Sequence, residues 1–372
     1  MKRKIIRQRL TSGLTASVVL LLLTAPAQAD FRPQANPTTV SPFSYTLAAE
    51  KSDKELAAEA DGAEEADGEE TDAGEQENAG EPEEVQEKER PEGELSGPEI
   101  LQKNPLIAHG LGEVDGIGTL NCLEGFEASY AAGIRVFEVD LRLTRDSKVV
   151  LRHDWRMGWQ DGVDEITIPT REAFLSKKIL GKYTPLSFRD LLLLMEEYPD
   201  ICVITDTKFT EADVYLHQFD AMVEDAKELG LSYLFDRFIF QIYNKNMFTA
   251  LSTEYHFPHY IYTLYNEGFE QTAAAFREKV EFCAQKGIGG ITMWDYWWKP
   301  AYRAIAEEHN IHVYVHTVND VEKTKSLVAS GVNGFYTDSM VPADFIEPPP
   351  EFPRAPVPED APAAEENTEQ ES

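Results

Sequence analysis

The sequence predicts one α/β domain of the (β/α)8 barrel (TIM barrel) class, with a long segment before it and a short one after it. Strand-like apolar runs alternate with segments whose apolar residues recur at helical spacing, over about 250 residues. Such repeated alternation is the signature of a closed parallel barrel. The main alternative is a doubly wound open sheet, but neither GxGxxG nor GxxxxGK(S/T) follows the first strand, so the usual nucleotide site of that fold is missing.

Nine runs have the composition of strands. In chain order they read LIAHG from residue 106, VFEVDL from 136, VVLRHD from 149, CVITDTK from 202, FIFQIYN from 238, YIYTLY from 260, GITMWD from 290, HVYVHTVN from 312 and GFYTDS from 334. The longer segments between them have an apolar spacing near 3.6 and end in Gly, Pro or Asn, as helices do. We therefore expect the folded domain to span residues 99–346.

Residues 1–29 have the pattern of a secretory signal peptide. Basic residues between 2 and 9 precede an apolar core at 14–23, and Ala27-Gln28-Ala29 resembles a cleavage site. The apolar run is short for a membrane span, and an uncleaved anchor is the alternative. We expect cleavage near Ala29 and export of the remaining chain, either secreted or held at the cell surface.

The segments that flank the domain are acidic and are predicted to be disordered, as a linker at 30–98 and a Pro/Glu-rich tail at 347–372. Between residues 50 and 94 the chain carries 20 acidic and 4 basic residues, which accounts for half of the net charge of −32. Such a segment buries too little apolar surface to offset its ordering entropy. Because the chain has no basic stripe to neutralise phosphates, we expect no nucleic acid partner.

The run VFEVDLRL, residues 136–143, carries the first chemical signal. Its apolar residues alternate with Glu138, Asp140 and Arg142, which is the period of a strand. Taken alone, the pattern also suits an antiparallel strand with one solvated face. In a barrel the outer strand face packs against helices, so Glu138 and Asp140 must point inward. Two carboxylates in one pocket repel each other, and a divalent cation is their natural partner.

Further polar residues stand at the ends of the predicted strands, where barrel active sites are built. They are His109, His153, Asp206, Lys208, Gln241, Trp294, His316, Asn319 and Asp338. Oxygen ligands without a cysteine cluster favour Mg²⁺ or Ca²⁺ over zinc. Two histidines suit proton transfer near neutral pH, and a lysine suits a phosphate oxygen. Either histidine alone could equally be structural, and the tryptophans at 294, 297 and 298 could equally pack the barrel or contact a lipid or sugar.

Several motifs resemble the glycerophosphodiester phosphodiesterase family: AHGLG, FEVDLRLTRDSKVVLRHDW, YTPLSFRDLL, ITDTK, YVHTVND and GVNGFYTDS. That family belongs to a superfamily of TIM-barrel phosphodiesterases with the phosphatidylinositol-specific phospholipases C (PI-PLC) and the sphingomyelinase D enzymes. The likeness covers almost all of residues 104–340, and its most specific part is the order His, Glu-x-Asp, His-Asp. It implies an acid–base pair, His109 and His153, and three metal ligands, Glu138, Asp140 and Asp206. The candidate substrate contacts are Lys208, Asn121, Gln241, Trp294 and His316.

The sequence departs from the family pattern in four places. His109-Gly110-Leu111 replaces the usual His-Arg-Gly, so an arginine that grips phosphate is absent. Thr119-Leu120-Asn121 replaces Pro-Glu-Asn, Asp206 stands where glutamate is common, and His316 stands where tryptophan is usual. Aspartate at 206 without the arginine is similar to the sphingomyelinase D branch, so the chain is a divergent member.

Together these features predict an exported, metal-dependent phosphodiesterase that cleaves a glycerophosphodiester or phospholipid-type diester with two histidines as acid and base. The substrate is a small molecule or a lipid, at a membrane surface or in the cell wall. The alternative is a catalytically degenerate barrel that binds a phosphate-bearing polymer of the cell surface without cleaving it. Glycoside hydrolysis is less favoured, because Glu138 and Asp140 are neighbours on one strand and do not flank a bond. The sequence does not predict the oligomeric state.

Overall fold

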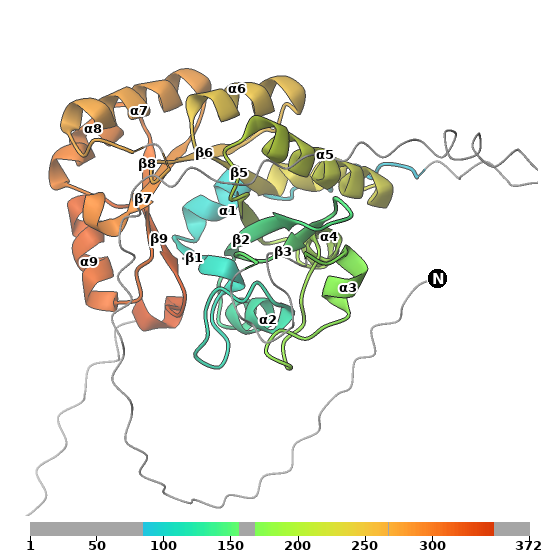
Figure 1. Cartoon of the computed structure of the whole chain (residues 1–372). Helices are drawn as coiled ribbons and strands as arrows, with labels where there is room; N and C mark the ends of the chain where they lie inside the picture. The colour runs from blue at the N-terminus through green and yellow to red at the C-terminus, as the bar shows by residue number, and fades with distance from the viewer. Residues whose placement is uncertain (1–84, 156–167, 267, 346–372) are drawn as a thin grey trace, which may run out of the picture. The chain divides into compact units, whose positions relative to one another are not determined.

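The computed structural model describes residues 85–155, 168–266 and 268–345, and these residues form a closed barrel of parallel strands (Figure 1). The barrel strands are β1 (Leu106–Ala108), β2 (Val136–Leu143), β4 (Cys202–Asp206), β5 (Phe238–Ile242), β6 (Tyr260–Thr263), β7 (Gly290–Trp294), β8 (His312–His316) and β9 (Gly334–Thr337). Each pairs in parallel with the next, and β1 pairs with both β9 and β2, which closes the ring. The predicted fold class is confirmed.

The remaining strand, β3 (Val149–Leu151), is not part of the ring. It pairs antiparallel with the end of β2, with Arg142 opposite Val150, beyond the point where β2 pairs with β4. β2 is therefore longer than its neighbours and carries residues past the rim of the barrel.

Helices cover the outside of the barrel (Figure 1). They are α2 (Leu123–Ala131), α4 (Phe188–Glu197), α5 (Ala212–Leu229), α6 (Lys245–Glu254), α7 (Ala273–Lys286), α8 (Arg303–Glu308) and α9 (Val321–Ser330), with α3 (Arg171–Leu175) before α4. Short 3-10 turns are η1 (His109–Leu111), η2 (Ser232–Arg237), η3 (Asp295–Trp297), η4 (Pro300–Tyr302) and η5 (Pro342–Phe345). Several helices begin at a side-chain cap such as Ser187 and end at a left-handed glycine such as Gly230, as the turn residues of the sequence predicted. No described helix has the length and apolarity that a bilayer span requires.

The barrel interior is apolar at the amino ends of the strands. Inward-facing residues of successive strands form one buried cluster: Ile107, Val136, Cys202, Ile204, Ile239, Ile261, Tyr314 and Tyr336. Helix α1 (Gly97–Lys103) adds Ile100 and Leu101 to this cluster and closes that end. Because the amino end is filled with apolar side chains, polar groups on the same strands are left to the carboxyl end.

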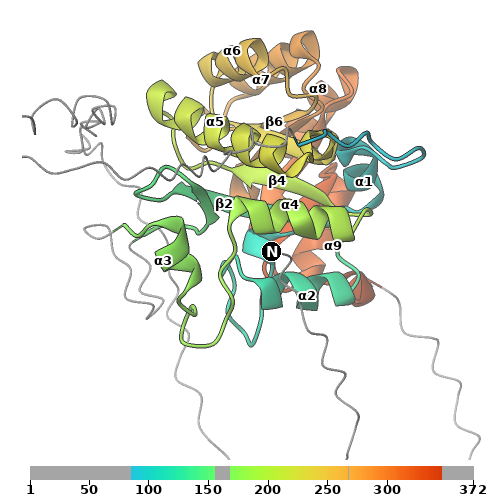
Figure 2. The same ribbon diagram turned by 90° about the vertical axis from the view of Figure 1, so that its right-hand side faces the viewer.

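The first described helix begins two residues before the predicted domain boundary at residue 99. Helix α1 begins at Gly97, and the segment before it lies beside the barrel, drawn in blue in Figure 2. The backbone N–H of Lys88 donates to the carbonyl of Gly230 at 2.9 Å, and Glu94 lies 3.7 Å from the buried guanidinium of Arg237. The acidic residues of this segment have specific partners on η2, which composition alone does not reveal. Residues 1–84 and 346–372, which include the predicted signal peptide, most of the predicted linker and the predicted tail, lie outside the described residues.

Candidate active site

Three carboxylates meet inside the barrel at the carboxyl ends of two neighbouring strands. Glu138 and Asp140 lie on β2 and Asp206 ends β4, with Asp140 and Asp206 in register. All three are buried, and one ligand oxygen from each lies within 4.8 Å of the others. The alternation of VFEVDLRL predicted the inward direction of the first two, and pairing of β2 with β4 adds the third.

Neighbouring polar groups fix the orientation of the carboxylates on β2. The backbone N–H of Gly110 donates to Glu138 at 2.7 Å. The side-chain amide of Asn121 donates to Asp140 at 2.7 Å, and its carbonyl accepts the backbone N–H of Asp140 at 2.9 Å. Asn121 therefore orients Asp140, a candidate metal ligand.

Asp206 is held by two tyrosine hydroxyls. Tyr243 donates to one carboxylate oxygen, and Tyr265 donates to the other at 3.2 Å. Gln241, a candidate substrate contact, donates to the Tyr265 hydroxyl at 3.4 Å and so also supports this end of the cluster. Neither tyrosine was among the predicted site residues, although both lie just beyond the strand ends in FIFQIYN and YIYTLY.

The Lys208 ammonium lies between two of the carboxylates. Its Nζ is 2.5 Å from Asp140 Oδ1 and also pairs with Asp206. Burial disfavours the charged form, but Asp140 and Asp206 outweigh it and raise the pKa of Lys208 well above its ordinary value. In this arrangement the lysine charge offsets part of the negative charge of the cluster.

The donor set fits a hard divalent cation. Three carboxylates converge, no thiolate of the described chain lies among them, and oxygen ligands suit Mg²⁺ or Ca²⁺. One ammonium leaves the cluster short of positive charge: burial, together with Asp140, raises the pKa of Glu138 to about 8. A divalent cation would supply the missing charge.

His109 follows β1 and lies beside the cluster. Its Nδ1 is 2.8 Å from Asp338 Oδ1, and the other oxygen of Asp338 accepts a bond from Asn319 at 2.7 Å. Burial disfavours protonation, but the bond to Asp338 and the charge of Glu138 outweigh it and raise the pKa of His109 to about 9. The sequence placed Asp338 at a strand end without a role, and the structure makes it the residue that orients His109.

His153 approaches the same cluster from the turn after β3. Its Nδ1 lies 2.9 Å from the carboxylate of Asp154. It lies near enough to act on Asp140: burial opposes ionisation of that carboxyl, but Lys208 and the nearby histidines outweigh it and lower the pKa of Asp140. Both histidines are thus brought to one site, each with an aspartate on Nδ1.

The last two candidate contacts, Trp294 and His316, lie side by side at the ends of β7 and β8. Their rings are 4.4 Å apart and Trp294 stacks on Tyr296, which is 69% exposed. Burial, with the nearby charge of His109, lowers the pKa of His316 to about 3, so this imidazole is neutral. Trp294 and the exposed Tyr296 form a stacked aromatic pair beside the site.

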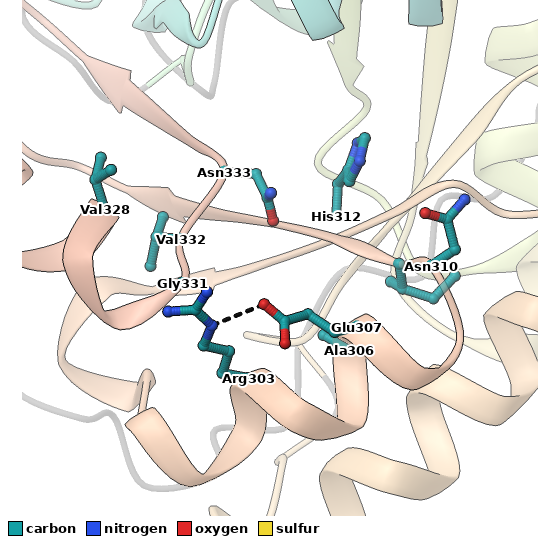
Figure 3. Close-up of a pocket in the computed structure, with 10 residues that line it drawn as sticks. Arg303, Ala306, Glu307, Asn310, His312, Val328, Gly331, Val332 and Asn333 are labelled. Carbon is teal, nitrogen blue, oxygen red and sulfur yellow. Dashed lines mark hydrogen bonds and ion pairs between the residues drawn. The ribbon is translucent and has the colours of Figure 1, made fainter.

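A separate pocket lies away from this chemistry. It has a volume of about 410 Å³ and is lined by residues of α8, α9 and the start of β8, among them Arg303, Glu307 and His312 (Figure 3). Arg303 is paired with Glu307 at 2.7 Å. His312 begins β8 and His316 ends it, so this pocket belongs to the amino end of the strand and the carboxylate cluster to the carboxyl end.

A parallel barrel that gathers carboxylates and histidines at the carboxyl ends of its strands has the architecture of a TIM-barrel enzyme. The chain belongs to the glycerophosphoryl diester phosphodiesterase family, whose sequence model matches residues 118–341. It is by homology a phosphoric diester hydrolase, and the family prediction is confirmed.

Solved structures of low sequence identity share the fold. A putative glycerophosphoryl diester phosphodiesterase from Silicibacter pomeroyi matches with a TM-score of 0.52 at 17% identity, over 63% of this chain and 90% of that one. One from Galdieria sulphuraria matches with a TM-score of 0.52 at 16% identity, over 63% and 94%. An Oleispira antarctica phosphodiesterase, in complex with the product sn-glycerol-3-phosphate, matches with a TM-score of 0.52 at 16% identity, over 64% and 95%.

Gly110, where the resemblance led us to expect an arginine, has no room for a side chain. Its φ is +54°, and a Cβ atom there would lie 2.6 Å from the Cα of Thr119. We expect Gly110→Ala to destabilise the fold more than Gly116→Ala, whose φ is +78° but whose Cβ would meet nothing within 4 Å. Gly116→Ala carries only the left-handed cost of about 1–2 kcal/mol. Gly110→Ala adds roughly 1–3 kcal/mol of overpacking, measurable by urea unfolding; equal losses would contradict the close contact.

The bond between His109 and Asp338 predicts a pH dependence. The pKa of His109 is raised from 6.5 to about 9, so its stabilisation is complete below about pH 6.5 and is lost as the pH rises through 9. In metal-free protein, Asp338→Asn should lower the pKa of His109 and flatten the fall in stability between pH 6.5 and 9. NMR titration of the imidazole C–H signals measures this, with the exposed His217 as internal reference. An unchanged His109 titration would show that Asp338 does not act on it.

Proposed function

We propose that this chain is a metal-dependent phosphodiesterase that cleaves a glycerophosphodiester or phospholipid-type diester with His109 and His153 as acid and base. The proposal is supported by two histidines that interact electrostatically with the same carboxylate cluster, each bonded through Nδ1 to an aspartate. Binding alone would need no such pair.

Glu138, Asp140 and Asp206 would hold Mg²⁺ or Ca²⁺. When bound, the cation polarises a non-bridging phosphate oxygen and offsets negative charge in the transition state. Lys208 then has to share its two carboxylate partners with the cation, which frees its ammonium to turn toward the substrate phosphate.

The raised pKa of His109 suits the acid and leaves His153 as the base. His153 would take a proton from the attacking oxygen, either of water or of a neighbouring substrate hydroxyl. That oxygen forms a bond to phosphorus, the bond from phosphorus to the leaving alcohol breaks, and His109 gives the departing oxygen its proton. Asp338 and Asp154 hold the two rings so that each Nε2 is left for this exchange.

The substrate proposal rests on two supports. The Oleispira enzyme of the same fold is described with sn-glycerol-3-phosphate as its product, which favours a glycerophosphodiester. The stacked rings of Trp294 and Tyr296 offer flat aromatic faces beside the site, which suit the alcohol part of a larger diester. Partners are therefore small-molecule or lipid diesters rather than nucleic acid.

The second candidate is a barrel that binds a phosphate-bearing surface polymer without turnover. It is favoured by one observation: the position of the family arginine is Gly110, which the neighbouring backbone crowds. Isothermal titration that shows affinity for such polymers, together with no cleavage of any diester, would select it.

The direct test is cleavage of a panel of diesters by the purified chain, followed by phosphorus NMR. We expect turnover with added Mg²⁺ or Ca²⁺ and none with EDTA. His109→Ala and His153→Ala should each lower kcat by about 10²–10⁴-fold, because each removes a proton-transfer group. His217→Ala, an exposed histidine of α5, is the matched control and should leave kcat unchanged. Full activity of either active-site variant would refute its role.

We also propose that the chain is exported. The support is the pattern of basic residues, apolar core and Ala27-Gln28-Ala29 in the first 29 residues. Intact-mass measurement of chain recovered outside the cytoplasm should give a protein that begins at Asp30. A mass that retains residues 1–29 would instead indicate an uncleaved anchor.

A further inference from the structure

Arg142 is the outermost charged residue on the inward face of β2. Glu138, Asp140 and Arg142 alternate along one strand, so their side chains share a face. Arg142 is paired with Val150 of β3, past the part of β2 that pairs with β4. Figure 1 shows β2 and β3 side by side. The Nε of Arg142 donates to the backbone carbonyl of His153 at 3.0 Å. Its guanidinium lies 5.4 Å from the ring of Phe209, which follows Lys208 in the chain. Arg142 thus stands between the His153 turn and the Lys208 loop.

The charge of Arg142 has no counter-ion among the described residues. Within residues 85–155, 168–266 and 268–345, no carboxylate pairs with it, and neither terminal nitrogen donates to a protein group. Half-buried arginines elsewhere in the described barrel do have partners, as Arg135 pairs with Asp200 and Arg171 with Asp225. A guanidinium that is partly removed from water, with two free donors, is suited to an external anion.

Lys208 does not supply a free positive charge for an external anion in the arrangement seen here. Its ammonium is engaged by Asp140 and Asp206, so its charge is neutralised inside the cluster. The position of the family arginine is Gly110, whose Cβ would meet Thr119. A phosphate at this mouth would face three carboxylates, so a positively charged side chain outside the cluster, in addition to any cation that the carboxylates hold, favours its binding.

We propose that Arg142 binds the non-bridging oxygens of the phosphate group, through its two terminal nitrogens, and so takes over phosphate binding at a site that lacks the family arginine. The guanidinium lies over the ring of Phe209, and the His153 carbonyl accepts a bond from Nε, so the side chain is held in place before the ligand arrives. The identity of the anion as a diester rests on the proposed function, but the binding of a phosphate group does not.

The test measures phosphate binding apart from turnover. The full chain and its variants are titrated with inorganic phosphate and with sn-glycerol-3-phosphate, followed by phosphorus NMR, and diester cleavage is measured separately. Arg142→Met should weaken both ligands about tenfold to a hundredfold, the range for loss of a charged hydrogen bond. Arg142→Lys keeps the charge without the fork and should lose less. Arg145→Met, which removes an exposed arginine three residues along the chain, should bind as the unchanged protein does.

The outcomes separate the two proposals. Weaker phosphate binding in Arg142→Met, with Arg145→Met and the thermal unfolding temperature unchanged, supports the phosphate role even if no diester is cleaved, in which case only the proposed function fails. Equal phosphate affinity in Arg142→Met and the unchanged protein overturns the role, whatever the turnover. If both Arg142 variants lose turnover equally and keep phosphate affinity, Arg142 acts only by positioning His153. Absence of phosphate binding by the unchanged protein also overturns it.

Discussion

The mutual repulsion of three buried carboxylates is the constraint to which the rest of the site responds. Glu138, Asp140 and Asp206 have ligand oxygens within 4.8 Å of one another and almost no contact with water. The surroundings supply donors from every side: a backbone N–H from Gly110, an amide from Asn121, two tyrosine hydroxyls and the ammonium of Lys208. Even so, burial and the charge of Asp140 raise the pKa of Glu138 to about 8, as expected where carboxylates outnumber nearby positive charges. Cation binding is the simplest physical solution, and it follows from the geometry rather than from a motif.

The departures from the family pattern are physically connected. Gly110 has a positive φ and lies against Thr119, and this close approach lets its N–H reach Glu138. The same turn presents Asn121 to Asp140. Filling position 110 with an arginine would disturb both contacts. The chain therefore uses the backbone at this position to support the carboxylates, and phosphate recognition has to come from elsewhere, for which Arg142 is the candidate.

The two ends of the barrel have divided roles. Apolar side chains and helix α1 fill the amino end, so the barrel is stabilised there by burial of apolar surface. The carboxyl end holds the buried charges, which destabilise the fold because they are removed from water. Because β2 extends past the rim and turns back through β3, it delivers Arg142 and His153 to the mouth from outside the ring of strands. This extension of β2 brings to the site groups that a strand ending at the rim could not place there.

The sequence by itself determined the barrel and the direction of most site residues, because alternation along a strand fixes which side chains share a face. VFEVDLRL sent Glu138 and Asp140 inward, and the order of strand-end residues gave His109, His153 and Asp206. Tertiary structure alone decided which groups meet across strands. The bonds of Asp338 to His109 and of Tyr243 to Asp206 join residues distant in sequence, as does the packing of residues 85–98 on η2. Periodicity carries no information on such partners, since they depend on register and closure of the ring.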